Sequence, residues 1–427
     1  MEIHVVSRGD SIYSIAQQYG VSMSRIMEDN RLNPAQPLVI GQTLVIQFPQ
    51  LIHTVQQGES LAGIAARYGL SLRQLYRNNP VLEGTPTIYP GQSLVIFYDQ
   101  PKEGVLSVNG YAYPYIDKDL LRRTVPYLSF VTPFTYGFTP EGELIPLDDQ
   151  ELIRIARSGG AGTLMHLSTL TEEGGFSNEL AHVVLNDLTV QQRLIDNLAS
   201  TLNERGYNGL DVDFEFIFAE DAQPYADFIQ RLTQRFNPQG IPVIVALAPK
   251  TSAEQRGLLY EGHNYRLLGQ AANELLLMTY EWGYTYGPPM AVAPLPNVRR
   301  VVEYALTEIP AHKLWLGIPN YGYDWPLPFV QGQTKATSIS NTYAVSLARK
   351  YGAEIQYDQI AQSPWFRYRD ENGTEHEVWF EDARSIRAKL ALIPEYGLWG
   401  AGYWNLMRPF PQNWLVLNAL YQIRDPR

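Results

Sequence analysis

One stretch, residues 207–216, limits the possible folds of this chain more than any other. It reads Tyr-Asn-Gly-Leu-Asp-Val-Asp-Phe-Glu-Phe. In a β-strand, alternation sends Asp211, Asp213 and Glu215 to one face. The opposite face then carries only apolar side chains, namely Leu210, Val212, Phe214 and Phe216. A strand with such an apolar face is covered by other elements, so three acids are expected to crowd together on a buried strand.

A buried row of carboxylates stabilises a fold poorly, because like charges repel and burial penalises each ionised form. The same arrangement is useful chemically. It raises the pKa of one carboxyl until that group holds a proton near neutral pH, while a neighbour stays ionised. This is what a glycosidic general acid requires. The alternative is the solvated face of an edge strand, which the apolar partners disfavour.

The same stretch resembles the signature of glycoside hydrolase family 18, Asp-Gly-x-Asp-x-Asp-x-Glu. It matches at Gly209, Asp211, Asp213 and Glu215. The first position departs, because Asn208 stands where the family has Asp. The resemblance implies that this position belongs to the substrate site but lies farthest from the scissile bond, so Asn208 is expected to tune activity.

Composition narrows the partners of the chain. Its 427 residues suit a large catalytic unit with accessory modules. The net charge of −11, without a basic cluster, makes nucleic acid and anionic membranes unsuitable partners. The sequence has no cysteine, and we find neither a secretion signal at its start nor a long apolar run. We therefore expect no membrane insertion.

The first part of the chain contains an internal repeat. The segment beginning at His4 recurs at His53, a shift from 4 to 53, and Gly41-Gln42 recurs as Gly91-Gln92. Ser11 and Ser60 stand where helix N-caps belong, and each unit is predicted to run strand, helix, helix, strand. Both units resemble the LysM module, which binds glycans that contain N-acetylglucosamine. The alternative is a pair of packing or dimerisation modules.

The LysM resemblance implies a shallow groove in each module. It would lie between residues 9–12 or 58–61 and the loop after the second helix. Two copies in tandem favour avidity for a polymeric glycan. We place the modules at 1–48 and 50–98, followed by a short polar linker.

Residues 104–427 are expected to form one α/β domain, a (β/α)8 TIM barrel, because strands alternate there with helical stretches. The eight candidate strands are residues 105–113, 127–131, 162–167, 209–216, 241–247, 274–278, 314–318 and 397–401. Functional residues of such barrels lie at the carboxyl ends of the strands. A small α+β insertion is predicted at about 330–390, with Asn372-Gly373 as a tight hairpin turn.

Other strand ends extend the family resemblance. Met278-Thr279-Tyr280-Glu281 is similar to the family's Met-x-Tyr-Asp, with Glu281 replacing Asp, and Trp404 matches the Trp that forms the floor of the −1 sugar site. Trp379, with Glu381 and Asp382, is expected on the insertion wall of the cleft. These three residues are either sugar contacts or structural.

The resemblance implies a retaining mechanism in which the substrate assists. Glu215 would be the acid, Asp213 would orient the acetamido group, Tyr280 would bind its carbonyl, and Asp211 would modulate Asp213. Met278, Glu281, Trp379, Trp404 and Asn208 would contact substrate. No metal or cofactor is implied, since the acids lack the His spacing of a zinc site.

Two LysM modules before such a barrel are similar to the family of cortical fragment-lytic enzymes of bacterial endospores. That resemblance implies a peptidoglycan hydrolase of the spore coat, active in germination, an N-acetylglucosaminidase made in the mother-cell cytoplasm. The alternatives are a chitinase-like hydrolase and a non-catalytic glycan-binding coat protein.

Overall fold

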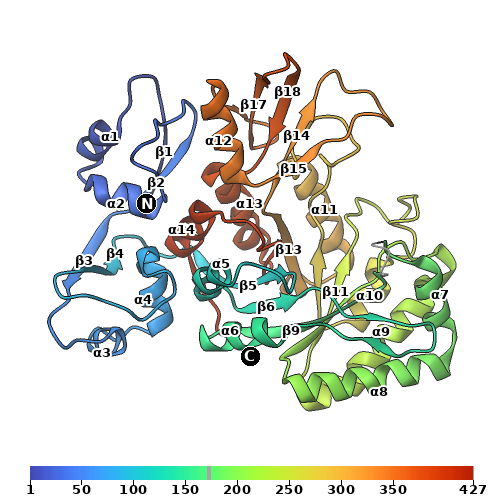
Figure 1. Cartoon of the computed structure of the whole chain (residues 1–427). Helices are drawn as coiled ribbons and strands as arrows, with labels where there is room; N and C mark the ends of the chain where they lie inside the picture. The colour runs from blue at the N-terminus through green and yellow to red at the C-terminus, as the bar shows by residue number, and fades with distance from the viewer. Residues whose placement is uncertain (171–174, 427) are drawn as a thin grey trace.

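The computed structural model describes residues 1–170 and 175–426. Two small modules lie side by side along one flank of a large α/β domain (Figure 1). The first consists of β1 (Glu2–Val5), α1 (Ile12–Tyr19), α2 (Met23–Asp29) and β2 (Thr43–Ile46). The second repeats this order with β3 (Pro49–Thr54), α3 (Leu61–Arg67), α4 (Leu72–Asn78) and β4 (Ser93–Tyr98). The predicted order of strand, helix, helix, strand is confirmed in both modules.

The serine caps explain where the module helices begin. Ser11 and Ser60 each accept a hydrogen bond from the backbone N–H three residues further on, and Ser22 and Ser71 do the same for the second helices. Such a cap satisfies a backbone donor that a helix start would otherwise leave without a partner.

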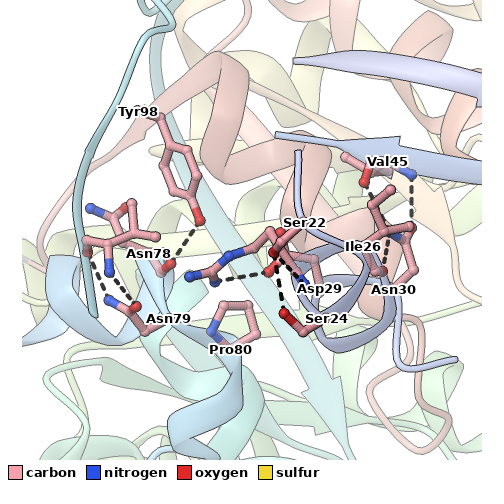
Figure 2. A network of polar contacts seen from close by, with 12 residues as sticks. Ser22, Ser24, Ile26, Asp29, Asn30, Val45, Asn78, Asn79, Pro80 and Tyr98 are labelled. Atoms are coloured by element: carbon pink, nitrogen blue, oxygen red, sulfur yellow. Dashed lines mark hydrogen bonds and ion pairs between the residues drawn. The ribbon is translucent and has the colours of Figure 1, made fainter. Parts of the chain in front are cut away.

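A repeated asparagine ties each second helix to the closing strand of its module (Figure 2). The Asn30 side chain donates to the Ile26 and Val45 carbonyls and accepts from the Val45 N–H at 2.7 Å. Asn79 makes the same three bonds in the second module, including one from the Val95 N–H at 2.7 Å. Both side chains are buried. The repeat at these positions therefore serves the fold of the modules.

Eight parallel strands close into the predicted barrel. Their order is β19-β13-β12-β11-β10-β9-β6-β5, and β19 pairs with β5 to complete the ring. They are β5 (Gly104–Ala112), β6 (Phe130–Pro133), β9 (Gly162–Ser168), β10 (Gly209–Asp213), β11 (Val243–Leu247), β12 (Glu274–Leu277), β13 (Leu314–Pro319) and β19 (Gly400–Trp404). A short strand, β20 (Tyr421–Ile423), adds to β5 in parallel. The (β/α)8 prediction is confirmed.

Three of the predicted strands differ from the structure by three residues at one end or both, and the others by one or two residues. The strand expected at 127–131 begins only at Phe130, because residues 125–127 form a short helical turn with Pro126 at its start. Gly397 belongs to the left-handed end of a helix, so β19 begins at Gly400. The strand at 209–216 ends at Asp213, and Phe216 adopts a φ of 57°. Glu215 therefore lies on a loop that leaves the strand.

Helices surround the barrel, and their apolar faces form its main core with the strands (Figure 1). They are α5 (Lys118–Thr124), α6 (Gln150–Ser158), α7 (Asn178–Asn186), α8 (Leu188–Arg205), α9 (Ala222–Phe236), α10 (Tyr265–Ala271), α11 (Leu295–Glu308), α13 (Ala383–Tyr396) and α14 (Pro411–Leu420). A short hairpin of β7 (Gly137–Phe138) and β8 (Leu144–Ile145) follows β6. A separate cluster of large side chains, including Tyr111, Phe134 and Trp315, fills the barrel interior.

Between β13 and β19 the chain builds a second, antiparallel sheet. Its order is β15-β14-β18-β17-β16. The strands are β14 (Gly322–Pro326), β15 (Thr337–Ile339), β16 (Gln356–Asp358), β17 (Ser363–Arg369) and β18 (Glu375–Trp379), and α12 (Asn341–Tyr351) packs against them. Gly373, at a φ of 80°, lies in the turn between β17 and β18. This sheet begins with β14, before the predicted start of the insertion.

Candidate active site

The strand β10 carries its acids into the barrel interior. Its register pairs Asp211 with His166 and Asp213 with Ser168 of β9. Asp211 is 0% exposed and Asp213 is 6% exposed. The alternate residues Leu210, Val212 and Phe214 belong to the core between strands and helices. The predicted division of this strand into an acidic and an apolar face is confirmed for these residues, whereas Phe216 lies beyond the strand and packs against Phe176.

Asp211 is held by a tyrosine that sequence reasoning missed. The Tyr111 hydroxyl donates to Asp211 Oδ2 at 2.7 Å. Burial raises the pKa of Asp211 to about 7, although the Tyr111 hydrogen bond opposes that rise. Asp211 Oδ1 has no hydrogen bond from the residues that the structure describes. This carboxyl can therefore hold a proton close to neutral pH.

Asp213 faces a neutral histidine. His166 Nε2 lies 3.7 Å from Asp213 Oδ2, and His166 Nδ1 lies 2.6 Å from the Thr135 hydroxyl. Burial lowers the pKa of His166 to about 3, so the ring carries no charge near neutral pH. Burial, followed by the charges of Glu215 and Asp211, raises the pKa of Asp213 well above its ordinary value. The two aspartates therefore resist being ionised together.

Glu215 stands at the mouth of the barrel, two positions beyond the end of β10. It is half-buried, unlike the two aspartates. Burial and the nearby charge of Glu281 raise the pKa of Glu215 to about 7. A carboxyl that is protonated near neutral pH and still reaches solvent meets the requirements of a general acid.

The end of β12 supplies the next group of predicted residues. Burial, then the charges of Asp213 and Glu215, raises the pKa of the Tyr280 hydroxyl well above its ordinary value, so this hydroxyl remains a donor. Glu281 has a φ of 66° and accepts hydrogen bonds from the Tyr321 and Tyr323 hydroxyls. The half-buried Met278 follows directly after the strand, and its backbone N–H donates to Leu247.

Trp404, the last residue of β19, is half-buried and lines an open groove. Its ring centroid lies 4.8 Å from that of Phe134 and 5.7 Å from that of Tyr111. The groove is also lined by Tyr113, Tyr115, Glu281, Tyr321, Tyr323 and Arg408. The structure thus brings the ends of β10, β12 and β19 together, as a barrel with a site at the carboxyl ends requires.

Trp379 lies on β18 of the insertion sheet. Its ring stacks on Trp365 at a centroid distance of 5.7 Å and an interplanar angle of 17°. It packs against the same apolar cluster as Trp404, a cluster that includes Tyr321 and Tyr323. The structure therefore places Trp379 on the insertion sheet, packed against the cluster that holds two tyrosines of the groove, and Trp379 is not among the residues that line the groove.

Glu381 and Asp382 have structural partners. Glu381 Oε2 pairs with Lys389 Nζ at 2.8 Å, and both side chains are buried. Asp382 caps α13 by accepting from the Arg384 and Ser385 N–H groups, and its carboxylate also pairs with the Arg384 side chain. Of the two predicted roles, sugar contact and structural support, the second therefore fits Glu381 and Asp382.

Asn208 lies apart from the acids. It precedes β10 at the amino-terminal end of the barrel, where its Oδ1 accepts from the Thr163 N–H at 2.9 Å. The carboxyl ends of the strands carry Glu215, Tyr280 and Trp404. The prediction that Asn208 contacts substrate does not fit this position and is corrected.

The structure adds Tyr111 and His166 to the acids. Both lie inside predicted strands, so the alternation of side chains along those strands could have indicated that they point into the barrel. Their partners Asp211 and Asp213, however, are remote in the sequence, so the sequence does not show these contacts. Within residues 1–170 and 175–426, no three His, Asp or Glu side chains are grouped as a metal site would require.

Comparison with known proteins defines the class of this chain. Residues 124–408 match the glycosyl hydrolases family 18, and residues 4–47 and 53–97 each match the LysM domain. The chain belongs to glycosyl hydrolase family 18 and is a glycoside hydrolase with two LysM domains.

More particularly, the chain is a homologue of the cortical fragment-lytic enzymes. It is 43% identical to the cortical fragment-lytic enzyme of Bacillus subtilis (strain 168) over 99% of both chains. Two crystal structures of the spore cortex-lytic enzyme SleL are similar over the whole chain. The Bacillus cereus protein has a TM-score of 0.84 and 37% identity, covering 99% of this chain and 98% of that chain. The Bacillus megaterium QM B1551 protein has a TM-score of 0.83 and 38% identity, with coverage of 99% and 98%.

Within the described part of the chain, every helix is too short or too polar to span a bilayer.

Proposed function

We propose that this chain hydrolyses the glycan of spore-cortex peptidoglycan after N-acetylglucosamine, as an N-acetylglucosaminidase that retains anomeric configuration. The observation that carries the proposal is the row Asp211, Asp213 and Glu215, which is buried or half-buried without a cationic partner among the described residues. The row lies at the end of the barrel where Glu281 and Trp404 line an open groove. Whole-length similarity to enzymes named for cortical fragments supports the choice of polymer.

In the first step, Glu215 donates its proton to the leaving oxygen, since its pKa of about 7 keeps it protonated near neutral pH. The acetamido oxygen of the −1 sugar attacks its own anomeric carbon, and the bond to the leaving sugar breaks. Asp213, ionised at this point, accepts from the acetamido N–H and stabilises the positive oxazolinium ion. The Tyr280 hydroxyl donates to the acetamido oxygen.

In the second step, the ionised Glu215 takes a proton from water, which attacks the anomeric carbon and opens the oxazolinium ring. Asp211 modulates the charge on Asp213, while the Tyr111 hydroxyl fixes the Asp211 carboxyl. Trp404 supports the distorted ring, and Met278, Glu281 and Trp379 shape the surrounding walls.

This chemistry selects the sugar at −1. Only a residue with a free 2-acetamido group supplies the internal nucleophile. N-acetylglucosamine has one, whereas the amide of muramic-δ-lactam is closed into a ring. Cleavage therefore follows N-acetylglucosamine.

The two LysM domains hold the enzyme on peptidoglycan, and tandem copies raise its residence there by avidity. We place the protein in the spore coat, where it degrades cortex glycan during germination.

The test is mass spectrometry of reducing ends released from spore-cortex fragments by the wild-type chain and by Glu215→Gln. Glu220→Gln, in the same connection between β10 and α9 but exposed, is the matched control. We expect N-acetylglucosamine reducing ends from the wild type and the control, and none from Glu215→Gln. Muramic reducing ends would overturn the cleavage specificity. Absence of products from all three chains, with cortex glycan still retained, would leave a binding protein.

A further inference from the structure

The open groove at the carboxyl end of the barrel carries charges of both signs. Glu281 lines it, and Asp213 and Glu215 lie at the same end of the barrel. Arg408 is the one cation among the described residues that line the groove. Acids repel an anionic ligand, whereas an arginine can bind one anionic group of it. The mechanism proposed above gives Arg408 no role.

The contacts of Arg408 leave most of its donors free. The guanidinium donates to Ser338 Oγ from Nη1 at 2.9 Å and to the Ser338 carbonyl from Nη2 at 3.2 Å. A guanidinium has five N–H groups, so three remain. Within the described part of the chain, Arg408 forms no ion pair with a carboxylate.

Burial makes this lack of an acid partner costly. The Arg408 side chain is half-buried, and burial lowers the pKa of its guanidinium, while the Tyr323 and Tyr321 hydroxyls act in the opposite direction. Arg384, which is half-buried in the insertion, pairs with Asp382 at 2.7 Å. Arg408 has no such acid, so an incoming carboxylate would supply the missing partner.

A row of aromatic rings lines the same groove. The ring centroid of Tyr113 lies 6.2 Å from that of Trp404 and 5.3 Å from that of Tyr115, on which it stacks at an interplanar angle of 26°. Trp404 and Tyr113 are half-buried, whereas Tyr115 is 76% exposed. Pyranose rings pack their C–H faces against such rings. The row therefore offers stacking surface to a sugar beyond the one on Trp404.

The polymer named in the proposed function places an anion beside this row. Peptidoglycan alternates N-acetylglucosamine with muramic sugars, so both neighbours of an N-acetylglucosamine at −1 are muramic. A muramic sugar with an open lactyl group carries a carboxylate, either on the lactyl group itself or on the peptide attached to it. Muramic-δ-lactam and chitin carry none. A guanidinium with spare donors binds a carboxylate through short, charge-assisted hydrogen bonds.

We propose that Arg408 determines specificity by binding the carboxylate of a muramic sugar that lies next to the sugar at −1. The inference rests on the proposed function, because the polymer supplies the anion. It makes the groove prefer glycans with open muramic sugars over chitin, whereas the acetamido chemistry at −1 accepts both. Arg408 contacts the substrate away from the reacting atoms, so its loss should act mainly on KM.

The test compares two forms of one tetrasaccharide in which N-acetylglucosamine alternates with muramic acid. The charged form keeps its lactyl carboxylates, and the amidated form has them converted into methyl amides. Arg408→Gln in the full chain should lower kcat/KM on the charged form about tenfold, through KM, and should leave the amidated form within about twofold. Arg408→Lys keeps the positive charge and should lose less on the charged form. Mass spectrometry of the reducing ends gives the initial rates.

Arg300→Gln is the matched control. Arg300 is exposed on α11, outside the groove, and also donates to a neutral side chain, Asn297 Oδ1, at 2.8 Å. This variant should change neither rate. An equal loss on both forms for Arg408→Gln would show that the arginine only ties Ser338 to the barrel, and no loss on the charged form would show that it binds no carboxylate. Either result would overturn the proposal.

A third substrate identifies the source of the carboxylate. The same tetrasaccharide with peptides on its lactyl groups carries carboxylates on the peptides alone. A loss for Arg408→Gln on this substrate as well supports recognition of the peptide carboxylate. A loss on the free lactyl form alone supports recognition of the lactyl carboxylate.

A crystal of the full chain with Glu215→Gln, soaked in the charged tetrasaccharide, provides a test that needs no hydrolysis. It should show a carboxylate about 3 Å from the Arg408 guanidinium. A bound glycan whose carboxylates all point away from Arg408 would overturn the proposal. If the wild type cleaves neither form of the tetrasaccharide, the proposed function fails, and the crystal still decides the role of Arg408.

Discussion

Two regions of this protein, the insertion and the barrel interior, both hold buried carboxylates but surround them in opposite ways. In the insertion, Glu381 pairs with Lys389 at 2.8 Å and Asp382 pairs with Arg384 while capping a helix. In the barrel, Asp211 and Asp213 are equally buried, but Asp211 receives only a tyrosine hydroxyl and Asp213 faces a neutral histidine.

This difference separates structural from chemical roles. A paired buried charge is strongly destabilising only when its partner is removed. An unpaired buried carboxyl raises its own pKa and costs stability wherever it is ionised. The barrel acids therefore lower the stability of the fold, which fits the catalytic role proposed for them.

The largest expected effect is on catalysis. In the proposed mechanism Asp213→Asn removes the charge that stabilises the positive intermediate, so hydrolysis of cortex fragments should fall by about 10²–10³-fold. The free energy of unfolding should not decrease, because the substitution removes an unfavourable charge. Initial rates and urea unfolding check both statements. A variant that is both inactive and less stable would place Asp213 with the structural acids.

The next effect is on stability. Lys389→Met leaves the Glu381 charge buried and unpaired, which should lower the free energy of unfolding by about 3–5 kcal/mol. The double variant Lys389→Met with Glu381→Leu should recover most of that loss. Urea unfolding measures both. A loss below about 1 kcal/mol for the single variant would show that the pair is not structural.

The pH dependence follows from the raised pKa of Glu215. An acid catalyst must hold its proton, so kcat/KM should fall as pH rises through about 7. Glu281→Gln removes a negative charge that raises this pKa, so it should move the alkaline limb to lower pH. Rates measured from pH 5 to pH 9 on a soluble fragment test the shift. If the alkaline limb stays in place in Glu281→Gln, the charge of Glu281 does not raise the pKa of Glu215.

The smallest effect concerns the tyrosine of the barrel interior. Tyr111→Phe removes one hydrogen bond to a buried carboxyl, and the free energy of unfolding should fall by about 1–2 kcal/mol. Tyr13→Phe, at an exposed position, is the control and should change nothing. Equal stabilities for the two variants would mean that Asp211 gains nothing from Tyr111.

Local patterns predicted much of this architecture. The alternation through Asp211 and Asp213 has period two, which determines faces without knowledge of neighbours. Ser11 and Ser60 act within a single helix turn, so their caps are visible in the sequence. By contrast, Tyr111 meets Asp211 across the barrel, and Gly41 and Gly91 have the same local conformation but different surroundings. Such contacts depend on how distant segments pack, and local patterns do not contain them.

The most direct test of the contrast between the two regions is the free energy of unfolding of Glu215→Gln at pH 8, compared with the wild type. Burial raises the pKa of Glu215 from 4.5 to about 7, so the folded state binds a proton that the unfolded state has lost between those values. The wild type therefore loses stability as pH rises through that window, and the variant does not. We predict that Glu215→Gln is more stable at pH 8, by on the order of 1–3 kcal/mol. A variant less stable than the wild type would contradict the account.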